Sequence, residues 1–468
     1  MRERRPIGPV DTMWLNMDRP NNLMVIDGLM WFDDVMDWEL LAPLLQRRLI
    51  DRYPVFSQRP VPPSNPFVLP QWEDDQDFDL SRHLRRITLP APGNLEALQR
   101  YVENRMSVPF DRSRPLWEMT LVEGYGSGCA LLSRFHHSLA DGIALSQVML
   151  SLTNATPTVD PDDPDEPEAH QSAPPNPGGF LDAARALQET GAQVLRGGLH
   201  ALSLLTDLAT PSRALDVLEL GWRTGKIADK LLLGNNPQTP FSGEPGLDKR
   251  AVWSGPRAIT DVKRVSRLTG ATVNDVLVAA VSGAINAYLR DHGAEAVDLT
   301  TMIPVNVRAP DQPLPRELGN KFALVFLKMP TGVTPPLQRV AESKRRMDSI
   351  KISPEALITF GLNTLIGRIE PHVSKSIVNF LSDKAIGVTT NVMGPQHQRY
   401  LAGVPIAGVV SWVPGAGRQT LGVCIFSFAG TVRVGFKVDA ALVPDPEKLV
   451  HAFDEDMDQL LWIAGRSA

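Results

Sequence analysis

Residues 135–142 read Phe135-His136-His137-Ser138-Leu139-Ala140-Asp141-Gly142. A strand-like run, residues 129–134, precedes this stretch, and a helix-like run, residues 143–152, follows it. Imidazole titrates near neutral pH, and a carboxylate one helical turn away can fix the geometry around it. A histidine held in this way at a strand-to-helix junction is suited to abstract a proton from a hydroxyl. The stretch therefore predicts a general base on the loop between a strand and a helix.

The polar residues of this stretch also have structural interpretations. One face of the following helix is apolar and carries Leu145, Val148, Met149 and Leu152. Asp141 therefore stands at the helix start as an N-cap, and Gly142 allows the backbone to turn tightly there. His136 has the alternative of a partly buried histidine bonded to the backbone. The pair, the aspartate spacing, the glycine and their context are more specific together than singly, which favours the catalytic interpretation.

Composition excludes several classes of protein. The chain has 468 residues, enough for roughly two or three domains, and 43% of them are hydrophobic, so we expect a large core. Its 47 basic and 53 acidic residues give a net charge of −6, which argues against a nucleic-acid partner. Cys129 and Cys424 are too few for a disulfide framework, so we expect a reducing interior. Cysteines and histidines show no metal-ligand spacing, and we expect neither a metal nor a cofactor.

Targeting segments are not expected. The charged N-terminal residues lead into residues 6–11 rather than into an apolar stretch, so we predict no signal peptide. No window offers about 18 to 20 uninterrupted apolar residues, so we predict no transmembrane helix. These features predict a cytoplasmic protein.

The chain divides into four expected parts. Residues 1–155 and 246–468 mix helical and strand-like patterns, which predicts an α/β fold of two halves. Residues 156–179 are rich in proline and acidic residues and predict a flexible linker. Residues 180–245 look helical, either as a connector packed on the second half or as an amphipathic surface that touches lipid. A cleft between such halves is a natural place for ligands.

Local signals place individual elements. Helices are expected over residues 38–52, 95–108 (capped by Asn94) and 446–464, and a capping box at residues 272–275 opens a further one. Strands are expected over residues 23–32, 117–122, 299–305, 323–328, 386–391, 408–412, 422–428 and 431–438.

His136 to Gly142 match the HHxxxDG motif of the CoA-dependent acyltransferase superfamily, which includes chloramphenicol acetyltransferases, carnitine acyltransferases and peptide-synthetase condensation domains. Shorter elements resemble the bacterial wax ester synthase/acyl-CoA:diacylglycerol acyltransferase (WS/DGAT) family. In chain order these elements are Pro9-Val10-Asp11, Pro115-Leu116-Trp117, Asn274-Asp275, Pro304-Val305-Asn306-Val307-Arg308, Leu318-Gly319-Asn320 and Thr390-Asn391-Val392-Met393-Gly394-Pro395. The resemblance spans nearly the whole chain. It implies two chloramphenicol-acetyltransferase-like subdomains with an active-site tunnel between them.

The resemblance implies a role for each residue of the motif. His137 is the general base that removes a proton from the acceptor hydroxyl, and the oxygen attacks the acyl-CoA thioester directly. Asp141 points away from the reaction and holds the loop by pairing with an arginine, for which Arg308 is one candidate. His136 braces the loop, and Gly142 supports it. The sequence has no GxSxG nucleophile elbow for a covalent acyl-enzyme.

Three residues outside the motif have open interpretations. Asn274 is either a polar group near the reacting atoms, such as an oxyanion contact, or a helix cap. Trp117 either lies in the core or shapes the acyl or acceptor pocket. Asn391 and Gly394 are expected to form a turn between the halves.

The substrates implied by the resemblance are a long-chain acyl-CoA and either diacylglycerol or a fatty alcohol, giving triacylglycerol or a wax ester. Contact with the inner membrane or a lipid droplet would be peripheral. Asn306 and Met393 replace a serine and a proline of the family pattern. Residues 22–26 lack its histidine, which puts acceptor preference in doubt. The rival hypotheses are a condensation-type or polyketide-associated acyltransferase with a carrier-bound donor, and a non-catalytic lipid-droplet binding protein.

Overall fold

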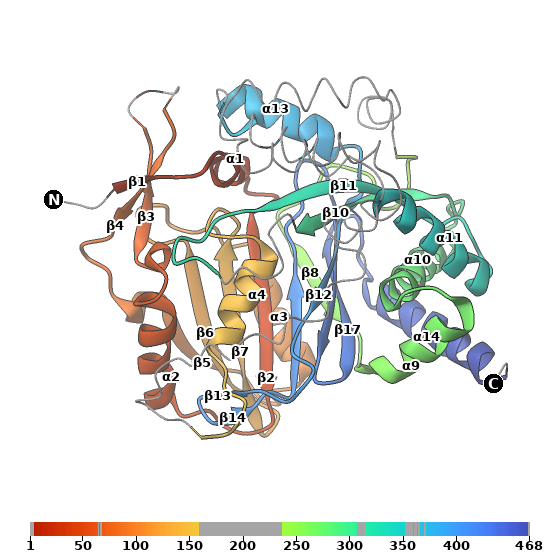
Figure 1. Ribbon diagram of the computed structural model, residues 1–468, viewed down its shortest axis with the longest axis horizontal. Coiled ribbons are helices and arrows are strands. Elements are labelled where there is room, and N and C mark those ends of the chain that lie inside the picture. Colours follow the sequence, from red (N-terminus) through yellow and green to blue (C-terminus); the bar gives the residue numbers. More distant parts are fainter. Residues whose placement is uncertain are drawn as a thin grey trace, which may run out of the picture.

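The computed structural model describes residues 4–63, 65, 68–158, 236–306, 314–351, 359, 363, 366–368 and 371–466. The expected linker beyond residue 158 and the expected helical connector up to residue 235 lie outside these residues, as does Arg308. The described elements form two halves, each built on its own sheet (Figure 1). The expected α/β class is therefore observed.

The sheet of the first half has five strands. Their order is β15 (Gly408–Trp412), β2 (Val25–Phe32), β7 (Gly128–His136), β6 (Trp117–Tyr125) and β5 (Leu84–Thr88). β5 runs parallel to β6, and the other pairs are antiparallel. A smaller sheet of order β1 (Arg4–Pro6), β4 (Gln71–Asp74) and β3 (Gln58–Val61) lies beside it.

Helices cover both faces of this sheet because successive β7 side chains point to opposite sides. Leu131 packs with the apolar faces of α2 (Trp38–Leu45) and α4 (Gly142–Ser151). Ala130 and Leu132 pack on the other side with α3 (Leu95–Met106), which Asn94 caps as expected. A π-helical turn, Gln46–Ile50, continues α2, so the helix expected over residues 38–52 is only partly regular.

The sheet of the second half has six strands in one path. Their order is β11 (Phe322–Met329), β10 (Leu299–Asn306), β12 (Gly387–Met393), β16 (Leu421–Phe428), β17 (Thr431–Asp439) and β8 (Lys249–Trp253), and β9 (Arg257–Ala258) also pairs with β17. β12 runs parallel to both of its neighbours. One further short pair, β13 (Tyr400–Leu401) with β14 (Val404–Pro405), lies near α4 (Figure 1).

The second core lies between this sheet and α9 (Ile259–Thr269), α10 (Val273–Asp291), α11 (Pro336–Lys351) and α14 (Glu447–Arg466). The expected capping box starts α10, since Thr272 and Asp275 exchange side-chain and backbone hydrogen bonds. Within the described residues no single helix is long and apolar enough to cross a membrane, although α9 and α10, bent by 97°, pass the same test as a pair. The apolar character of α10 matches its burial in this core.

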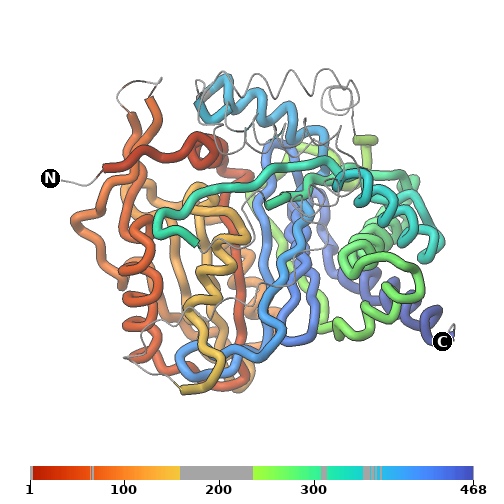
Figure 2. Tube along the Cα trace, viewed as in Figure 1, coloured from red at the N-terminus to blue at the C-terminus, as the bar shows by residue number. Residues whose placement is uncertain are grey.

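Several segments join the halves. β15 follows the second-half strand β12 in the chain but pairs with β2, so it completes the sheet of the first half. The segment leading into β11 reaches across to the first half (Figure 2), where the Arg316 guanidinium donates to the Asp51 carbonyl. α1 (Pro9–Met17) packs against α13 (Pro371–Ser382) above both sheets (Figure 1).

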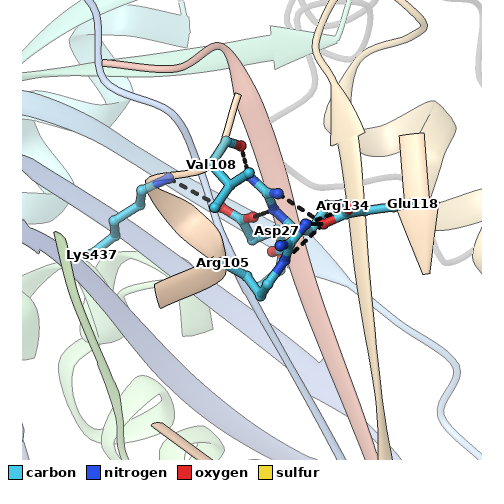
Figure 3. Close-up of polar contacts among 7 residues, drawn as sticks. Asp27, Arg105, Val108, Glu118, Arg134 and Lys437 are labelled. Carbon is cyan, nitrogen blue, oxygen red and sulfur yellow. Dashed lines mark hydrogen bonds and ion pairs between the residues drawn. The ribbon is translucent and has the colours of Figure 1, made fainter. Parts of the chain in front are cut away.

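A buried cluster of charges also connects them (Figure 3). Arg134 on β7 is 1% exposed, and its guanidinium donates to Asp27 Oδ1 at 3.1 Å and to Glu118 Oε1 at 2.8 Å. Lys437 on β17 donates to the second oxygen of Asp27 at 3.0 Å, and Arg105 on α3 donates to both oxygens of Glu118. Charges taken out of water need such compensation. The cluster therefore holds β7 against its neighbouring strands in the first half and, through Asp27 and Lys437, against β17 of the second half. Arg134 lies two residues before the histidine pair.

Candidate active site

The histidine pair lies where β7 ends. His136 is the last residue of β7, and its N–H donates to the carbonyl of Leu116 at 3.0 Å. The N–H of His137 donates to the carbonyl of Met24 at 2.7 Å. Because both neighbours of the strand contribute a bond, the backbone of the pair is held from two sides. His137 is 8% exposed.

Asp141 caps α4, as the sequence predicts. Its Oδ1 accepts from the N–H of Ala144 at 2.9 Å, and its Oδ2 accepts from the N–H of Lys321 at 3.0 Å. The second bond ties the histidine loop to the segment that leads into β11. The expected arginine partner is not established, because Arg308 lies outside the described residues.

Gly142 is the first residue of α4, and the predicted reason for it is wrong. Its φ is not among the positive values found at other glycines. A Cβ atom at this position would meet nothing within 4 Å. The backbone therefore does not require a glycine here.

His136 is held by its own loop. The N–H of Ser138 donates to His136 Nδ1 at 3.1 Å, so Nδ1 is an acceptor and the ring proton lies on Nε2. That nitrogen faces Asp18 Oδ2 at 3.7 Å. Burial opposes ionisation of Asp18, but its contact with His136, the N–H of Met24 and Arg112 hold its pKa below the ordinary value. These contacts hold the His136 ring in place within its loop.

The ring of His137 lies among aromatic side chains. Trp14 stacks on it with centroids 4.4 Å apart and planes 17° apart, and Phe322 lies at 5.4 Å. Its Nδ1 lies 3.0 Å from Asn320 Oδ1. Burial disfavours the charged imidazolium and lowers the pKa of His137 to about 4. The imidazole is therefore neutral near pH 7, as a general base must be before it accepts a proton.

Two polar residues in contact with this site were not predicted. Asn320, which is 7% exposed, donates from Nδ2 to Asp11 Oδ1 at 2.7 Å and to the carbonyl of His137 at 2.7 Å. Its backbone N–H also donates to Asp11 Oδ1, at 2.8 Å. Burial raises the pKa of Asp11 to about 7, although the bonds from Asn320 oppose this change. Both residues belong to elements of the family pattern, which marks their positions without giving a role.

Asn274 does not cap its helix, because Thr272 does so. Its Oδ1 instead accepts from Asn391 Nδ2 at 2.7 Å, which joins the Asn-Asp and Thr-Asn elements of the sequence. Asn391 lies within β12, so the turn predicted for it is wrong. No described contact joins Asn274 to His137, and its proximity to the reacting atoms stays a prediction.

Trp117 is a core residue. It is 1% exposed, its Nε1 donates to the carbonyl of Phe56 at 2.8 Å, and its ring stacks on His83. A ring enclosed in this way has no surface left for a substrate. The structure therefore favours the core interpretation over the pocket interpretation.

A cavity of about 640 Å³ lies near the start of β10 and the end of β11, lined among others by Thr300, Phe326 and Lys328. None of its lining residues contacts His137 in the described hydrogen bonds or ring contacts. The tunnel between the halves stays a prediction. Among the described residues, no group of three or more His, Cys, Asp or Glu side chains is arranged to hold a metal ion.

The sequence matches two models of one known protein family. Residues 7–277 match the wax ester synthase/diacylglycerol acyltransferase catalytic domain, and residues 318–461 match the WS/DGAT C-terminal domain. The chain belongs to this family of acyltransferases. The resemblance drawn from the short sequence elements and the predicted enzyme class are thereby confirmed.

Individual relatives agree with this assignment. A Mycobacterium tuberculosis protein named probable diacylglycerol O-acyltransferase tgs1 is 28% identical over 415 residues, which cover 86% of this chain and 84% of the relative. The solved wax ester synthase/diacylglycerol acyltransferase from Marinobacter aquaeolei VT8 superposes with a TM-score of 0.68 at 20% identity, covering 98% and 99% of the two chains. The first condensation domain of a calcium-dependent antibiotic synthetase gives 0.60 at 15% identity, covering 99% and 96%. These likenesses confirm the expected fold of two chloramphenicol-acetyltransferase-like halves.

Proposed function

We propose that this chain transfers a long-chain acyl group from acyl-CoA to the hydroxyl of diacylglycerol or of a fatty alcohol, with His137 as the general base. One observation carries the residue assignment: the buried His137 ring is held by Asn320 at Nδ1, and no described hydrogen bond to another residue is made at Nε2. Burial, which lowers the pKa of His137 to about 4, keeps this ring neutral near pH 7. Its Nε2 is the nitrogen left for an incoming hydroxyl.

The reaction needs one base and no covalent enzyme intermediate. His137 Nε2 takes the hydroxyl proton while the acceptor oxygen bonds to the thioester carbonyl carbon, which gives a tetrahedral intermediate. Collapse of that intermediate breaks the carbon–sulfur bond. The leaving CoA thiolate then takes the proton back from Nε2, so the products are an ester and free CoA, and His137 is neutral again.

The test offers purified protein radiolabelled long-chain acyl-CoA with diacylglycerol and hexadecanol in parallel reactions. We expect labelled triacylglycerol, wax ester or both, and we expect His137→Ala to lower kcat by about 10²- to 10⁴-fold. His83→Ala is the matched control, because His83 is also buried with a lowered pKa but packs on Trp117. Wild-type transfer by folded His137→Ala protein would refute the mechanism.

Further arms of the assay address the rivals. An acyl group supplied on a carrier protein should be a poorer donor than acyl-CoA, and the reverse result would favour a condensation-type enzyme. Absence of turnover with every acceptor, together with retained liposome binding, would favour a lipid-binding protein.

We also propose that the protein acts in the cytoplasm and contacts the inner membrane or lipid droplets peripherally. Both acceptors are lipid-soluble, and the described residues contain no single helix long and apolar enough to cross a membrane. The full chain should float with liposomes of anionic phospholipid containing diacylglycerol. Protein that stays at the bottom of the gradient at every lipid concentration would remove this proposal.

A further inference from the structure

A neutral histidine has two tautomers, and only one of them serves the proposed reaction. The proton lies either on Nδ1 or on Nε2, and the hydrogen bond made by one nitrogen decides the state of the other. If Nε2 carried the proton, it could donate to the acceptor hydroxyl but could not deprotonate it. The contacts of Nδ1 therefore decide whether His137 is a base.

The orientation of the Asn320 amide follows from its neighbours. Its Nδ2 has two hydrogens, and it faces two acceptors, Asp11 Oδ1 and the carbonyl of His137, each at 2.7 Å. Rotating the amide by 180° would place its oxygen against a carboxyl oxygen and a carbonyl oxygen and would lose both bonds. The network thus assigns Oδ1, and not Nδ2, to the side that faces His137.

The tautomer follows from that orientation. An amide oxygen only accepts, so the 3.0 Å contact between Asn320 Oδ1 and His137 Nδ1 requires a proton on Nδ1. We propose that Asn320 is the positioning residue that selects the Nδ1–H tautomer of His137, and that Asp11 holds the Asn320 amide in the orientation this needs. The assignment rests on the proposed function and adds to it the reason why Nε2 is the basic nitrogen.

The surroundings of Asp11 are shaped for its carboxyl group. It is 8% exposed and lies on α1, three residues before Trp14, so one helix supplies both the group that holds Asn320 and the ring that covers His137. A Cβ atom at Gly8 would come within 2.7 Å of Asp11 Oδ2, and one at Gly319 within 3.2 Å. Larger residues at these two positions would therefore displace the carboxyl group.

The two halves of the molecule contribute to the base together. Asp11 and His137 belong to the first half, whereas Asn320 lies 183 residues beyond His137, in the segment that leads into β11 at the edge of the second sheet. Asp141 accepts the N–H of the next residue, Lys321, and so fixes the same segment. Besides the hydrogen bond of the ring to the His137 backbone itself, the Asn320 amide is the acceptor from another residue that the described contacts give this ring.

The main test measures the tautomer of His137 and the rate of turnover separately. The measurement is nitrogen NMR of protein labelled with ¹⁵N-histidine, in which the His137 signals are identified as those lost in His137→Gln. The wild-type spectrum should show a protonated Nδ1 and an unprotonated Nε2. Asn320→Ala should lose this pattern and lower kcat by about 10²- to 10⁴-fold with KM changed less than about threefold, since the wrong tautomer costs about 10⁴-fold in a serine protease triad. Asn286→Ala is the control, because Asn286 is equally buried and donates to the carbonyl of Thr331 away from the site.

An exchange of the two side chains keeps the proposal testable if Asn320→Ala does not fold. Asn320→Asp places two buried carboxyl groups against each other and should be nearly inactive. The double variant Asp11→Asn/Asn320→Asp again offers His137 Nδ1 an acceptor held by an amide, and it should recover at least tenfold in kcat over Asn320→Asp.

The outcomes distinguish this inference from the proposed function. Unchanged kcat in folded Asn320→Ala, loss of kcat with an unchanged tautomer, or no recovery in the exchange variant would each overturn the role of Asn320. Absence of turnover in wild type with the Nδ1–H tautomer present would instead overturn the function and leave the tautomer assignment standing.

Discussion

Trp14 stacks on His137 with ring centroids 4.4 Å apart, although 123 residues of sequence would suggest no relation between them. This contact fixes the plane of the imidazole, while the hydrogen bond to Asn320 fixes the position of Nδ1 within that plane. Trp14→Leu should lower kcat by about 10- to 100-fold, since misplacing a reacting group by about 1 Å can cost about 10²-fold. Trp14→Phe retains an aromatic face and should stay within about threefold of wild type. Initial rates with both variants, checked for folding by circular dichroism, measure this, and equal loss in both would contradict the stacking argument.

The acidic limb of the pH–rate profile should lie well below the ordinary histidine value of 6.5, because burial lowers the pKa of His137 to about 4. The base is the neutral form, so it persists as pH falls from 7 to 5. The folded pKa lies below the unfolded value, and the stability this group contributes is complete above 6.5 and is lost as pH falls toward 4. The measurement is kcat/KM between pH 4.5 and 8 with Tm at each pH. A pH–rate profile whose acidic midpoint lies near 6.5, and stays there in every variant of the site, would contradict the burial argument.

Asp11→Asn should stabilise the fold at alkaline pH. Burial raises the pKa of Asp11 to about 7, above its unfolded value of 3.8, so its contribution to stability is complete below 3.8 and is lost as pH rises toward 7. Each pKa unit corresponds to about 1.4 kcal/mol, so removing the ionised group should gain a few kcal/mol at pH 8 and less at pH 5. Urea unfolding at both pH values checks this. A gain that is the same at pH 5 and pH 8 would mean that the carboxyl group is not the cause.

Asp141→Ala and Asn94→Ala remove helix caps of similar geometry. Asp141 accepts from Ala144 N at 2.9 Å, and Asn94 accepts from Ala97 N at 3.1 Å. Each change should cost about 1 kcal/mol of stability. Asp141→Ala also releases the N–H of Lys321 and should lower kcat at least tenfold, whereas Asn94→Ala should leave kcat unchanged. Equal activity in the two variants would show that Asp141 acts on stability alone.

The charge cluster around Arg134 predicts an order of stabilities. Arg134→Met leaves Asp27 and Glu118 without their shared cation in a buried site and should cost about 3–5 kcal/mol. Lys437→Met leaves Asp27 paired with Arg134 and should cost less. The free energy of unfolding in urea measures both, and Asp27→Asn/Lys437→Met should recover part of the loss caused by Lys437→Met. A larger loss for Lys437→Met than for Arg134→Met would contradict this description of the cluster.

Local patterns in the sequence were sufficient for much of the fold. The alternation of residues 23–32 and 117–122 predicts β2 and β6, and the expected caps at Asn94, Asp141 and Thr272 are all observed. These features depend on residues within one turn or one strand of each other. The same local range explains the error at Gly142, where a glycine near a helix start indicated a conformation that only glycine adopts easily, whereas its φ is not positive.

Contacts over long sequence distances could not be predicted in this way. Asn320 meets Asp11 across 309 residues, and Asn274 meets Asn391 across 117. Periodicity carries no information about such pairs, because they depend on how the two sheets are placed. The family elements marked these positions without their roles, and the same limit left Trp117 with two interpretations until its contacts with Phe56 and His83 were known.

β15 sets a condition on the order in which the protein can be completed during translation. Until residues 408–412 leave the ribosome, β2 has an open edge, and its unpaired N–H and C=O groups are a template for joining another chain. The first half is therefore exposed to misassembly while most of the remaining chain is being synthesised. This makes it a candidate client of chaperones that bind nascent chains. For the same reason, the gene cannot be divided between the two sheets to give fragments that each fold with a complete set of strands.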